Sequence, residues 1–379
     1  MRVTIVSESF LPTVNGVTTS VCRVLDHLRA EGHEAQVISP AARSPKYYAG
    51  FPISQVPSVA YRQFPVGLPS SQVQHLIADF EPDVVHAASP FLLGAQAMTA
   101  ARRLKIPSVA IFQTDVAGYA RRNNLGPATT LAWRLVRRVH ERADLTLVPS
   151  TASMADLRGA GVRRLARWGR GVDLDAYHPH NRDGTATAFL RRRLAPRGET
   201  VIGYVGRIAP EKQLERLEAL RGLPGIRIAI VGGGPAEPQV RRALRGMPVT
   251  WLGMLTGEPL AAAYASFDLF VHTGTEETFG QTLQEAHASG VPVIAPRAGG
   301  PIDLVDHGVD GFLFEADDDQ AMRAYAELLV VDAPLRRRMG EAGRRAVLGR
   351  SWTAVCGELL EHYDRVIRSS AISRHSTST

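Results

Sequence analysis

Cysteine is scarce in this sequence. Cys22 and Cys356 are the only thiols among 379 residues, too few for a disulfide framework or a four-thiolate zinc site, so we expect a reducing compartment. The chain also lacks any apolar stretch of the roughly 18 to 20 residues that a membrane-spanning helix requires. Met1 and Arg2 lead directly into a strand pattern at 3–6 and not into an export signal. We therefore expect a cytoplasmic protein that does not span a bilayer.

Sequence patterns of three other kinds of function are missing. The glycine loop at 232–234 is not part of a G-x-G-x-x-G motif with an acidic residue about 20 positions later, which argues against a nicotinamide-dependent oxidoreductase. The basic segments are not interleaved with aromatic residues that stack on bases, which argues against nucleic-acid binding. No Asp-x-Asp motif of the metal-dependent transferases stands at a useful place, so we expect neither a metal nor a cofactor.

Positive charge is distributed unevenly along the chain. Residues 1–180 contain 20 Lys and Arg against 13 Asp and Glu, whereas residues 181–379 contain 24 of each kind. Within the first half, residues 101–170 hold 14 basic and 4 acidic side chains. Such a concentration indicates an anionic partner: a membrane surface, an acidic substrate or nucleic acid.

A repeated alternation of strands and helices is the main pattern that the sequence does contain. A single core rarely grows past roughly 250 to 300 residues, so 379 residues indicate two domains. The alternation is interrupted by a stretch at 177–181 that contains Pro, His and Asn, and it then starts again. It predicts an α/β fold with two Rossmann-like domains, residues 1–178 and 179–351, that face each other across a cleft.

The expected elements have definite bounds. In the first half we expect strands at 3–7, 35–38, 84–86 and 108–112, and helices at 16–31, 72–78 and 94–104. In the second half we expect strands at 201–205, 227–231, 249–252, 269–272 and 292–295. An amphipathic helix at 352–367 and a frayed tail at 372–379 follow. Open parallel sheets bind ligands at the carboxyl ends of their strands, so the loops after strands are where we expect the site.

Two cations follow the first strand of the second domain. Arg207 comes soon after the 201–205 run, and Lys212 lies beyond the turn at Pro210. Two charges on either side of a turn can grip a diphosphate from two directions, the task of a metal ion in other nucleotide enzymes. A solvated basic loop is the alternative interpretation of the same residues.

A Phe-Gly turn with a carboxylate on each side follows another strand. Phe279, Gly280 and Gln281 stand at the start of a predicted helix, where unpaired backbone N–H groups form an anion site. Glu277 precedes this turn and Glu285 lies inside the helix. The two carboxylates can accept hydrogen bonds from hydroxyls on two parts of one ligand, which fits a sugar at Glu277 and a ribose at Glu285. Surface solvation is the ordinary alternative for a lone helical glutamate.

Gly16 occupies a similar place in the first domain, at the start of the helix that follows the opening strand. Its small size permits a close backbone approach, and its N–H lies at a helix start, so we expect it to contact phosphate from this side.

The motifs named so far, with the Gly299-Gly300 pair and the turn from Gly308 to Gly311, resemble those of the retaining glycosyltransferases of family four, which have the GT-B architecture. The similarity covers residues 1 to about 367. The segment 168–173 is most similar to the GDP-mannose-dependent α-mannosyltransferases that modify membrane glycolipids, such as the phosphatidylinositol mannosyltransferases.

This resemblance implies a role for each matching residue. It implies that Arg207 and Lys212 hold the donor diphosphate, that Glu277 holds the transferred sugar and Glu285 the ribose, and that Gly16 meets the phosphate from the first domain. The implied donor is GDP-mannose, and the implied acceptor is a glycolipid of lipoglycan synthesis. The resemblance also implies that the last helix, 352–368, crosses back onto the first domain. A UDP-sugar is the competing donor.

The acceptor side departs from the family pattern. Where the family commonly has a histidine after a strand, this sequence has Gln113, followed by Asp115. Gln113 cannot exchange a proton at neutral pH, so its role is electrostatic or positional, or the proton falls to Asp115. His86 ends another strand and is a further acceptor candidate, although strand-end histidines are more often structural.

Two further expectations concern the reaction and the membrane. We see no carboxylate placed as a nucleophile, so we expect same-face attack in which the leaving phosphate takes the acceptor proton. Leu131, Trp133 and Leu135 lie among arginines in one helical segment, a composition suited to the inner face of an anionic plasma membrane. A normal amphipathic helix with its apolar side in the core is the alternative interpretation.

Overall fold

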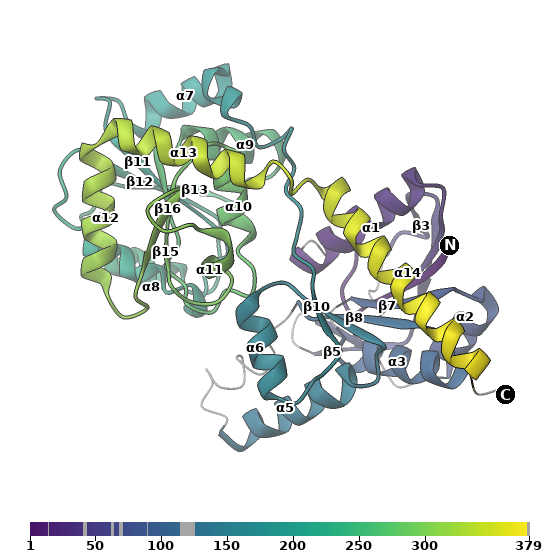
Figure 1. Cartoon of the computed structure of the whole chain (residues 1–379). Coiled ribbons are helices and arrows are strands. Elements are labelled where there is room, and N and C mark those ends of the chain that lie inside the picture. Colours follow the sequence, from purple (N-terminus) through teal and green to yellow (C-terminus); the bar gives the residue numbers. More distant parts are fainter. Residues whose placement is uncertain are drawn as a thin grey trace. The chain divides into compact units, whose positions relative to one another are not determined.

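The computed structural model describes residues 1–13, 15–40, 44–61, 64–67, 71–88, 90–113 and 126–376. The chain forms two compact units (Figure 1), one comprising Met1–Arg170 with Thr353–Thr379 and the other Gly171–Trp352. The sequence places the boundary somewhat later, after residue 178. Each unit is built on a mostly parallel sheet covered by helices, so the predicted α/β fold with two Rossmann-like domains is confirmed.

The sheet of the first unit has eight strands in the order β10-β9-β8-β7-β1-β2-β4-β3. Its neighbours pair in parallel except β3 and β4, and a separate antiparallel hairpin joins β5 to β6. The strands are β1 (Arg2–Ser7), β2 (Glu34–Ser39), β3 (Tyr47–Tyr48), β4 (Phe51–Gln55), β5 (Ser58–Tyr61), β6 (Phe64–Gly67), β7 (Val84–Ala88), β8 (Ser108–Ile111), β9 (Leu145–Val148) and β10 (Leu165–Arg167).

The first helix of the first unit begins at a side-chain cap. Asn15 caps the first helix by accepting hydrogen bonds from the N–H groups of Val17 and Thr18, both at 3.0 Å, so the helix starts at Gly16 as predicted. The helices are α1 (Gly16–Ala30), α2 (Gln72–Phe80), α3 (Leu92–Leu104), α5 (Gly126–His140), α6 (Thr151–Gly159) and α14 (Trp352–Ser376).

Helix α14 packs on the first unit, where Figure 1 shows it in yellow. The Trp168 indole N–H donates to the carbonyl of Val355 at 2.8 Å, and the buried Tyr363 hydroxyl lies 2.5 Å from His86 Nδ1. The predicted crossing of the last helix onto the first domain is therefore confirmed. The predicted frayed tail is wrong as far as Ser376, because no glycine or proline stops the helix after Ile367.

The two faces of α5 have different surroundings. Val139 is buried, and Trp133 and Val136 pack against a small core formed by Phe112, Val148, Leu157 and Val162. Leu131 and Leu135 lie on the other face, 66% and 38% exposed. Among the residues that the structure describes, no helix is both long and apolar enough to cross a membrane.

The second unit contains a six-stranded, fully parallel sheet in the order β13-β12-β11-β14-β15-β16. Its strands are β11 (Thr200–Val205), β12 (Ile226–Val231), β13 (Val249–Gly253), β14 (Leu269–Val271), β15 (Val293–Pro296) and β16 (Gly311–Phe314). Its helices are α7 (Thr185–Leu194), α8 (Glu237–Ala243), α9 (Gly257–Ser266), α10 (Gln281–Ala288), α11 (Pro301–Leu304), α12 (Asp319–Val331) and α13 (Ala333–Val347), with 3-10 turns η1 (Pro179–Asp183), η2 (Pro210–Lys212) and η3 (Leu214–Leu220).

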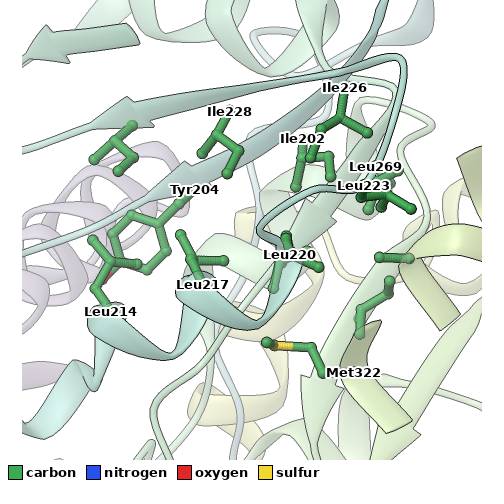
Figure 2. Close-up of a cluster of buried hydrophobic side chains, with 14 of the residues drawn as sticks. Ile202, Tyr204, Leu214, Leu217, Leu220, Leu223, Ile226, Ile228, Leu269 and Met322 are labelled. Atoms are coloured by element: carbon green, nitrogen blue, oxygen red, sulfur yellow. The ribbon is translucent and has the colours of Figure 1, made fainter. Parts of the chain in front are cut away.

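One core of the second unit anchors the loop that carries the cations. Leu214, Leu217 and Leu220 of η3 are fully buried against Ile202 and Tyr204 of β11 (Figure 2). Burying a leucine side chain contributes roughly 1.5 to 3 kcal/mol, so three of them hold η3 firmly on the sheet. Since η2 directly precedes η3, this packing fixes the position of Lys212 at the end of η2.

Candidate active site

Lys212 and Glu277 meet at the carboxyl edge of the second sheet. Lys212 ends η2 after β11, and Glu277 lies in the loop after β14, the strand next to β11 in the sheet. The Lys212 Nζ is 2.5 Å from Glu277 Oε2, and the two side chains are 20% and 18% exposed. The structure thus brings together two residues that the sequence assigns to diphosphate and sugar.

The charge of Glu277 is fixed by its neighbours. Burial alone would raise the pKa of its carboxyl, but the Lys212 ammonium and the backbone N–H of Phe279 more than offset this and hold the pKa at about 2. Glu277 is therefore an ionised acceptor of hydrogen bonds at neutral pH and cannot serve as a general acid.

His272 is a buried histidine beside this pair. It follows β14 directly, its side chain is 2% exposed, and its Nε2 lies 3.9 Å from Glu277 Oε2. Burial lowers the pKa of His272 to about 4, against the opposing pull of Glu277. The imidazole is therefore neutral at pH 7, and it forms one wall of the site without adding a charge.

Glycines allow the loops of the site to pack backbone against backbone. A Cβ on Gly274 would lie 2.9 Å from the carbonyl oxygen of Glu211, and one on Gly300 would collide with the backbone of Phe279. The Gly300 N–H also donates to the carbonyl of Glu277 at 2.6 Å. The Gly299-Gly300 pair therefore holds the Glu277 turn in place, which gives this motif a structural reason.

Helix α10 begins next to Glu277. Gly280 is its N-cap, with a φ of 104° that side-chain-bearing residues rarely adopt, and Phe279 before it is buried. The first N–H groups of a helix have no partner within it, so this turn presents donors and the positive end of the helix dipole. Gln281, which the sequence predicts to contact the donor, donates through Nε2 to the carbonyl of Gly171 at 3.1 Å, and its Oε1 is buried without a hydrogen bond among the described residues.

Glu285 is held by a buried tyrosine. The Tyr264 hydroxyl donates to Glu285 Oε2 at 2.7 Å, and Tyr264 itself is completely buried in α9. Burial, with the nearby carboxylate, raises the pKa of Tyr264 well above its usual range, so this hydroxyl is a permanent donor. It fixes one carboxylate oxygen of Glu285 at a position one turn inside α10.

Arg207 is the more exposed of the two predicted diphosphate ligands. Its guanidinium forms an ion pair with Glu211, and its side chain is 61% exposed. Its backbone carbonyl accepts a hydrogen bond from the Tyr204 hydroxyl at 3.1 Å. The backbone at Arg207 is thus fixed while the head group lies at the surface. An exposed pair of this kind is weak and can reopen for an anion.

The first unit gathers Gly16, Gln113 and Arg170. Arg170 Nη2 donates to Gln113 Oε1 at 2.8 Å, and a Cβ on Gly16 would lie 2.5 Å from Arg170 Nη1. Gly16 therefore makes room for this guanidinium at the start of α1. The structure joins two predicted residues through an arginine that sequence reasoning did not single out.

The remaining acceptor candidates have different surroundings. His86 is 1% exposed in β7, is hydrogen-bonded to Tyr363, and has a pKa lowered by burial to about 3. A side chain as deeply buried as that of His86 favours a role in packing over contact with an acceptor. Asp115, predicted as a catalytic and acceptor residue, lies outside the described residues. Within the described part of the chain, no group of three or more His, Cys, Asp or Glu side chains is placed to hold a metal ion.

Comparison with known proteins identifies the family. Residues 14–176 match the family described as Glycosyltransferase Family 4, and residues 187–346 match Glycosyl transferases group 1. The chain is 47% identical to a GDP-mannose-dependent alpha-mannosyltransferase of Mycolicibacterium smegmatis, over 97% of this chain and 98% of that protein. The chain belongs to glycosyltransferase family four.

Other family-four relatives and solved structures agree with this assignment. A GDP-mannose-dependent alpha-mannosyltransferase of Corynebacterium glutamicum is 44% identical, over 98% of this chain and 90% of that protein. HepE of Anabaena in complex with UDP superposes with a TM-score of 0.78 at 20% identity, over 96% of this chain and all of that chain. Sucrose-phosphate synthase from Thermosynechococcus elongatus gives 0.79 at 19% identity, over 97% and 99%. The predicted GT-B fold is confirmed, and the chain is a glycosyltransferase.

Three residues of this glycosyltransferase were missed by the sequence reasoning. His272 stands at the end of a predicted strand, and that position was the available signal. Arg170 stands in a segment that was noted only for its family resemblance. Glu8 follows β1, and its carboxylate accepts from the N–H groups of Phe91 and Gly94 at 3.2 and 3.1 Å, so it already occupies the start of α3.

Proposed function

We propose that the enzyme transfers mannose from GDP-mannose to a membrane glycolipid, with retention of the α configuration. The observation that carries this proposal is the Lys212–Glu277 pair beside the start of α10. The near-full-length relatives named GDP-mannose-dependent alpha-mannosyltransferases support the identity of the donor.

The donor diphosphate needs positive charge as it leaves. Lys212, Arg207 and the N–H groups at Gly280 supply that charge without a metal, because all three lie in loops that follow strands of one parallel sheet. Ionised Glu277 accepts hydrogen bonds from mannose hydroxyls, and Glu285, oriented by Tyr264, accepts them from the ribose.

The Glu277 carboxyl is ionised, so it cannot give a proton to the leaving group, and the proton must come from another source. The bond between the anomeric carbon and the phosphate oxygen breaks, and the acceptor hydroxyl bonds to the anomeric carbon on the same face. Its proton passes to the departing phosphate, which balances charge without a protein base. In the first unit, Gln113 and Arg170 then position the acceptor, and Gly16 contributes a phosphate contact at the start of α1.

Helix α5 supports a peripheral association with the inner face of the plasma membrane. One face of this helix carries four exposed residues that lie three or four positions apart: Leu131, Arg134, Leu135 and Arg138. The opposite face of α5 packs against the core, so the exposed face, which is apolar and basic, can bind anionic lipid.

Calorimetric titration tests the donor. GDP-mannose should bind at least tenfold more tightly than UDP-glucose, and Glu277→Ala should reduce turnover by orders of magnitude in a folded protein. Tighter binding of UDP-glucose would assign the enzyme to UDP-sugar-dependent transfer, and wild-type turnover of Glu277→Ala would overturn the site.

Sedimentation with vesicles tests the acceptor side. The full chain should sediment with vesicles rich in anionic phospholipid at low salt and be released as salt is raised, because the attraction is screened. Leu131→Asp with Leu135→Asp should abolish sedimentation, whereas Leu348→Asp, at an exposed leucine of the second unit, should not. Equal sedimentation of both variants would contradict a membrane role for α5.

A further inference from the structure

A second basic site lies at the amino-terminal edge of the sheet that carries the donor residues. A cavity of about 650 Å³ is lined there by Asp268, which precedes β14, and by Pro292, which precedes β15. The candidate donor site lies beyond the carboxyl ends of the same strands. The cavity and the pair of Lys212 and Glu277 therefore lie at opposite ends of the strands of this sheet.

Arginine dominates the lining of this cavity. Its charged members are Arg182, Arg336, Arg337, Arg344 and Arg345, with Asp268 and Glu341. Asp268 is already neutralised, because Arg182 donates to one carboxylate oxygen at 2.5 Å and Arg191 to the other at 3.1 Å. Glu341 alone therefore opposes the remaining arginines, and the cavity carries an excess of positive charge.

Two of these arginines have structural tasks. Arg344 Nη1 donates to the carbonyls of Tyr177 and Ala288 at 2.9 and 2.8 Å, which ties α13 to the end of α10. Arg336 Nη1 donates to the carbonyl of Leu329 at 2.5 Å. Burial lowers the pKa of Arg336; Asp268 opposes this effect, and the neighbouring arginines add to it. An anion in the cavity would offset the effect of the neighbouring arginines.

Arg337 and Arg345 have no such task. Both are exposed on α13, and neither forms a side-chain hydrogen bond or ion pair with the described residues, Glu341 included. They stand eight positions apart, on the face of α13 that lines the cavity. These two guanidinium groups are free to bind a ligand.

Ser289 provides an independent sign of a ligand. It lines the same cavity and is 6% exposed, yet its Oγ is buried without any hydrogen-bond partner among the described residues. A buried hydroxyl without a partner is costly, and native proteins rarely keep one without a reason. A ligand oxygen in the cavity would give this hydroxyl its partner.

We propose that this arginine-lined cavity binds a small molecule through a phosphate group, held by Arg337, Arg345 and the Ser289 hydroxyl. Guanidinium groups match the geometry of phosphate oxygens, and the cavity has room for a substituent on the phosphate. Ser289 is the C-cap of α10, and Gly280 is its N-cap, so eight helical residues, or about 12 Å, join this site to the candidate donor site.

Calorimetry with inorganic phosphate, pyrophosphate and glycerol 3-phosphate tests the proposal on the full chain. The Lys212→Ala background removes the candidate donor site, and binding to the cavity should persist in it. In that background Arg337→Ala with Arg345→Ala should weaken binding at least tenfold, and Ser289→Ala should weaken it about tenfold without lowering the urea midpoint, since no native bond is lost.

The matched control is Arg245→Ala with Arg338→Ala, which removes the same charge from exposed positions of the second unit outside the cavity. Binding should be unaffected in this variant. Tighter binding of glycerol 3-phosphate than of phosphate would support an organic phosphate ligand, and equal binding would support the free anion. Loss of all binding with Lys212→Ala alone, or equal affinity in the cavity and control variants, would overturn the proposal.

Discussion

Replacing Lys212 with methionine tests the electrostatics of the site most sharply. Methionine keeps a long, flexible stem and removes the charge. In the native protein the ammonium lies 2.5 Å from Glu277 Oε2, and the pKa of the Glu277 carboxyl is about 2, against an ordinary value of 4.5. This difference between the two pKa values corresponds to about 3 kcal/mol in the free energy of unfolding at neutral pH.

The pH dependence of this contribution has a definite sign. Because the pKa of Glu277 is lower in the folded protein than in the unfolded chain, the contribution is present above about pH 4.5 and is lost as the pH falls toward 2. In Lys212→Met, burial acts on the carboxyl without the ammonium and raises its pKa. The free energy of unfolding of the variant should then fall as the pH rises. Compared with the native protein, the variant is therefore most destabilised near pH 7, by about 3 kcal/mol.

Urea denaturation at pH 7 and pH 5 measures the effect. Lys212→Met should unfold at lower urea than the native protein at pH 7 and recover part of the difference at pH 5. Adding Glu277→Gln to it should restore stability at pH 7 without restoring transfer, because no unpaired carboxylate is then buried. Arg338→Met is the control for loss of an exposed cation. A native urea midpoint for Lys212→Met at both pH values would refute the reasoning.

Three further substitutions have defined outcomes. Gly280→Ala forces a side chain into the left-handed region and should cost about 1 to 2 kcal/mol in a urea titration and lower turnover; an unchanged midpoint would show that the α10 cap is unstrained. Tyr264→Phe removes the donor to Glu285 and should weaken GDP-mannose binding about tenfold by calorimetry, and unchanged affinity would remove Glu285 from the ribose site. Tyr363→Phe breaks the bond to His86 and should lower thermal stability by about 1 kcal/mol with GDP-mannose affinity unchanged, whereas loss of affinity would show that α14 shapes the donor site.

Five of the six strands of the second sheet were predictable, because buried parallel strands read as short apolar runs, whereas β16 (Gly311–Phe314) was not among the expected strands. Strand-like runs of four or five residues, three of them followed directly by glycine, place Arg207, Lys212 and Glu277 at one sheet edge without any knowledge of packing. The start of α10 at Gly280 was predictable for the same reason, since the Phe-Gly turn precedes a run of good helix formers. What the sequence could not provide was the contact itself, because the distance between Lys212 and Glu277 depends on the glycine-to-backbone packing of their loops.

Contacts between distant segments were beyond sequence reasoning. Arg170 meets Gly16 and Gln113 only after the whole first unit has folded, and no local pattern relates these three positions. The sequence does not determine which side of α5 faces the core, because Leu131 and Trp133 are both apolar; the small core under Trp133 determines it. The Ser289 hydroxyl, which has no hydrogen-bond partner among the described residues, has no signature in the sequence at all.

A crystal structure with bound GDP-mannose is the most direct test of the central claim, that Lys212, Arg207 and the start of α10 hold the donor diphosphate. The account predicts phosphate oxygens within hydrogen-bond distance of Lys212 Nζ and of the backbone N–H groups at Gly280 and Gln281, with mannose hydroxyls on Glu277. A diphosphate bound elsewhere, with the Lys212–Glu277 pair unchanged and without contact to either ligand part, would contradict it.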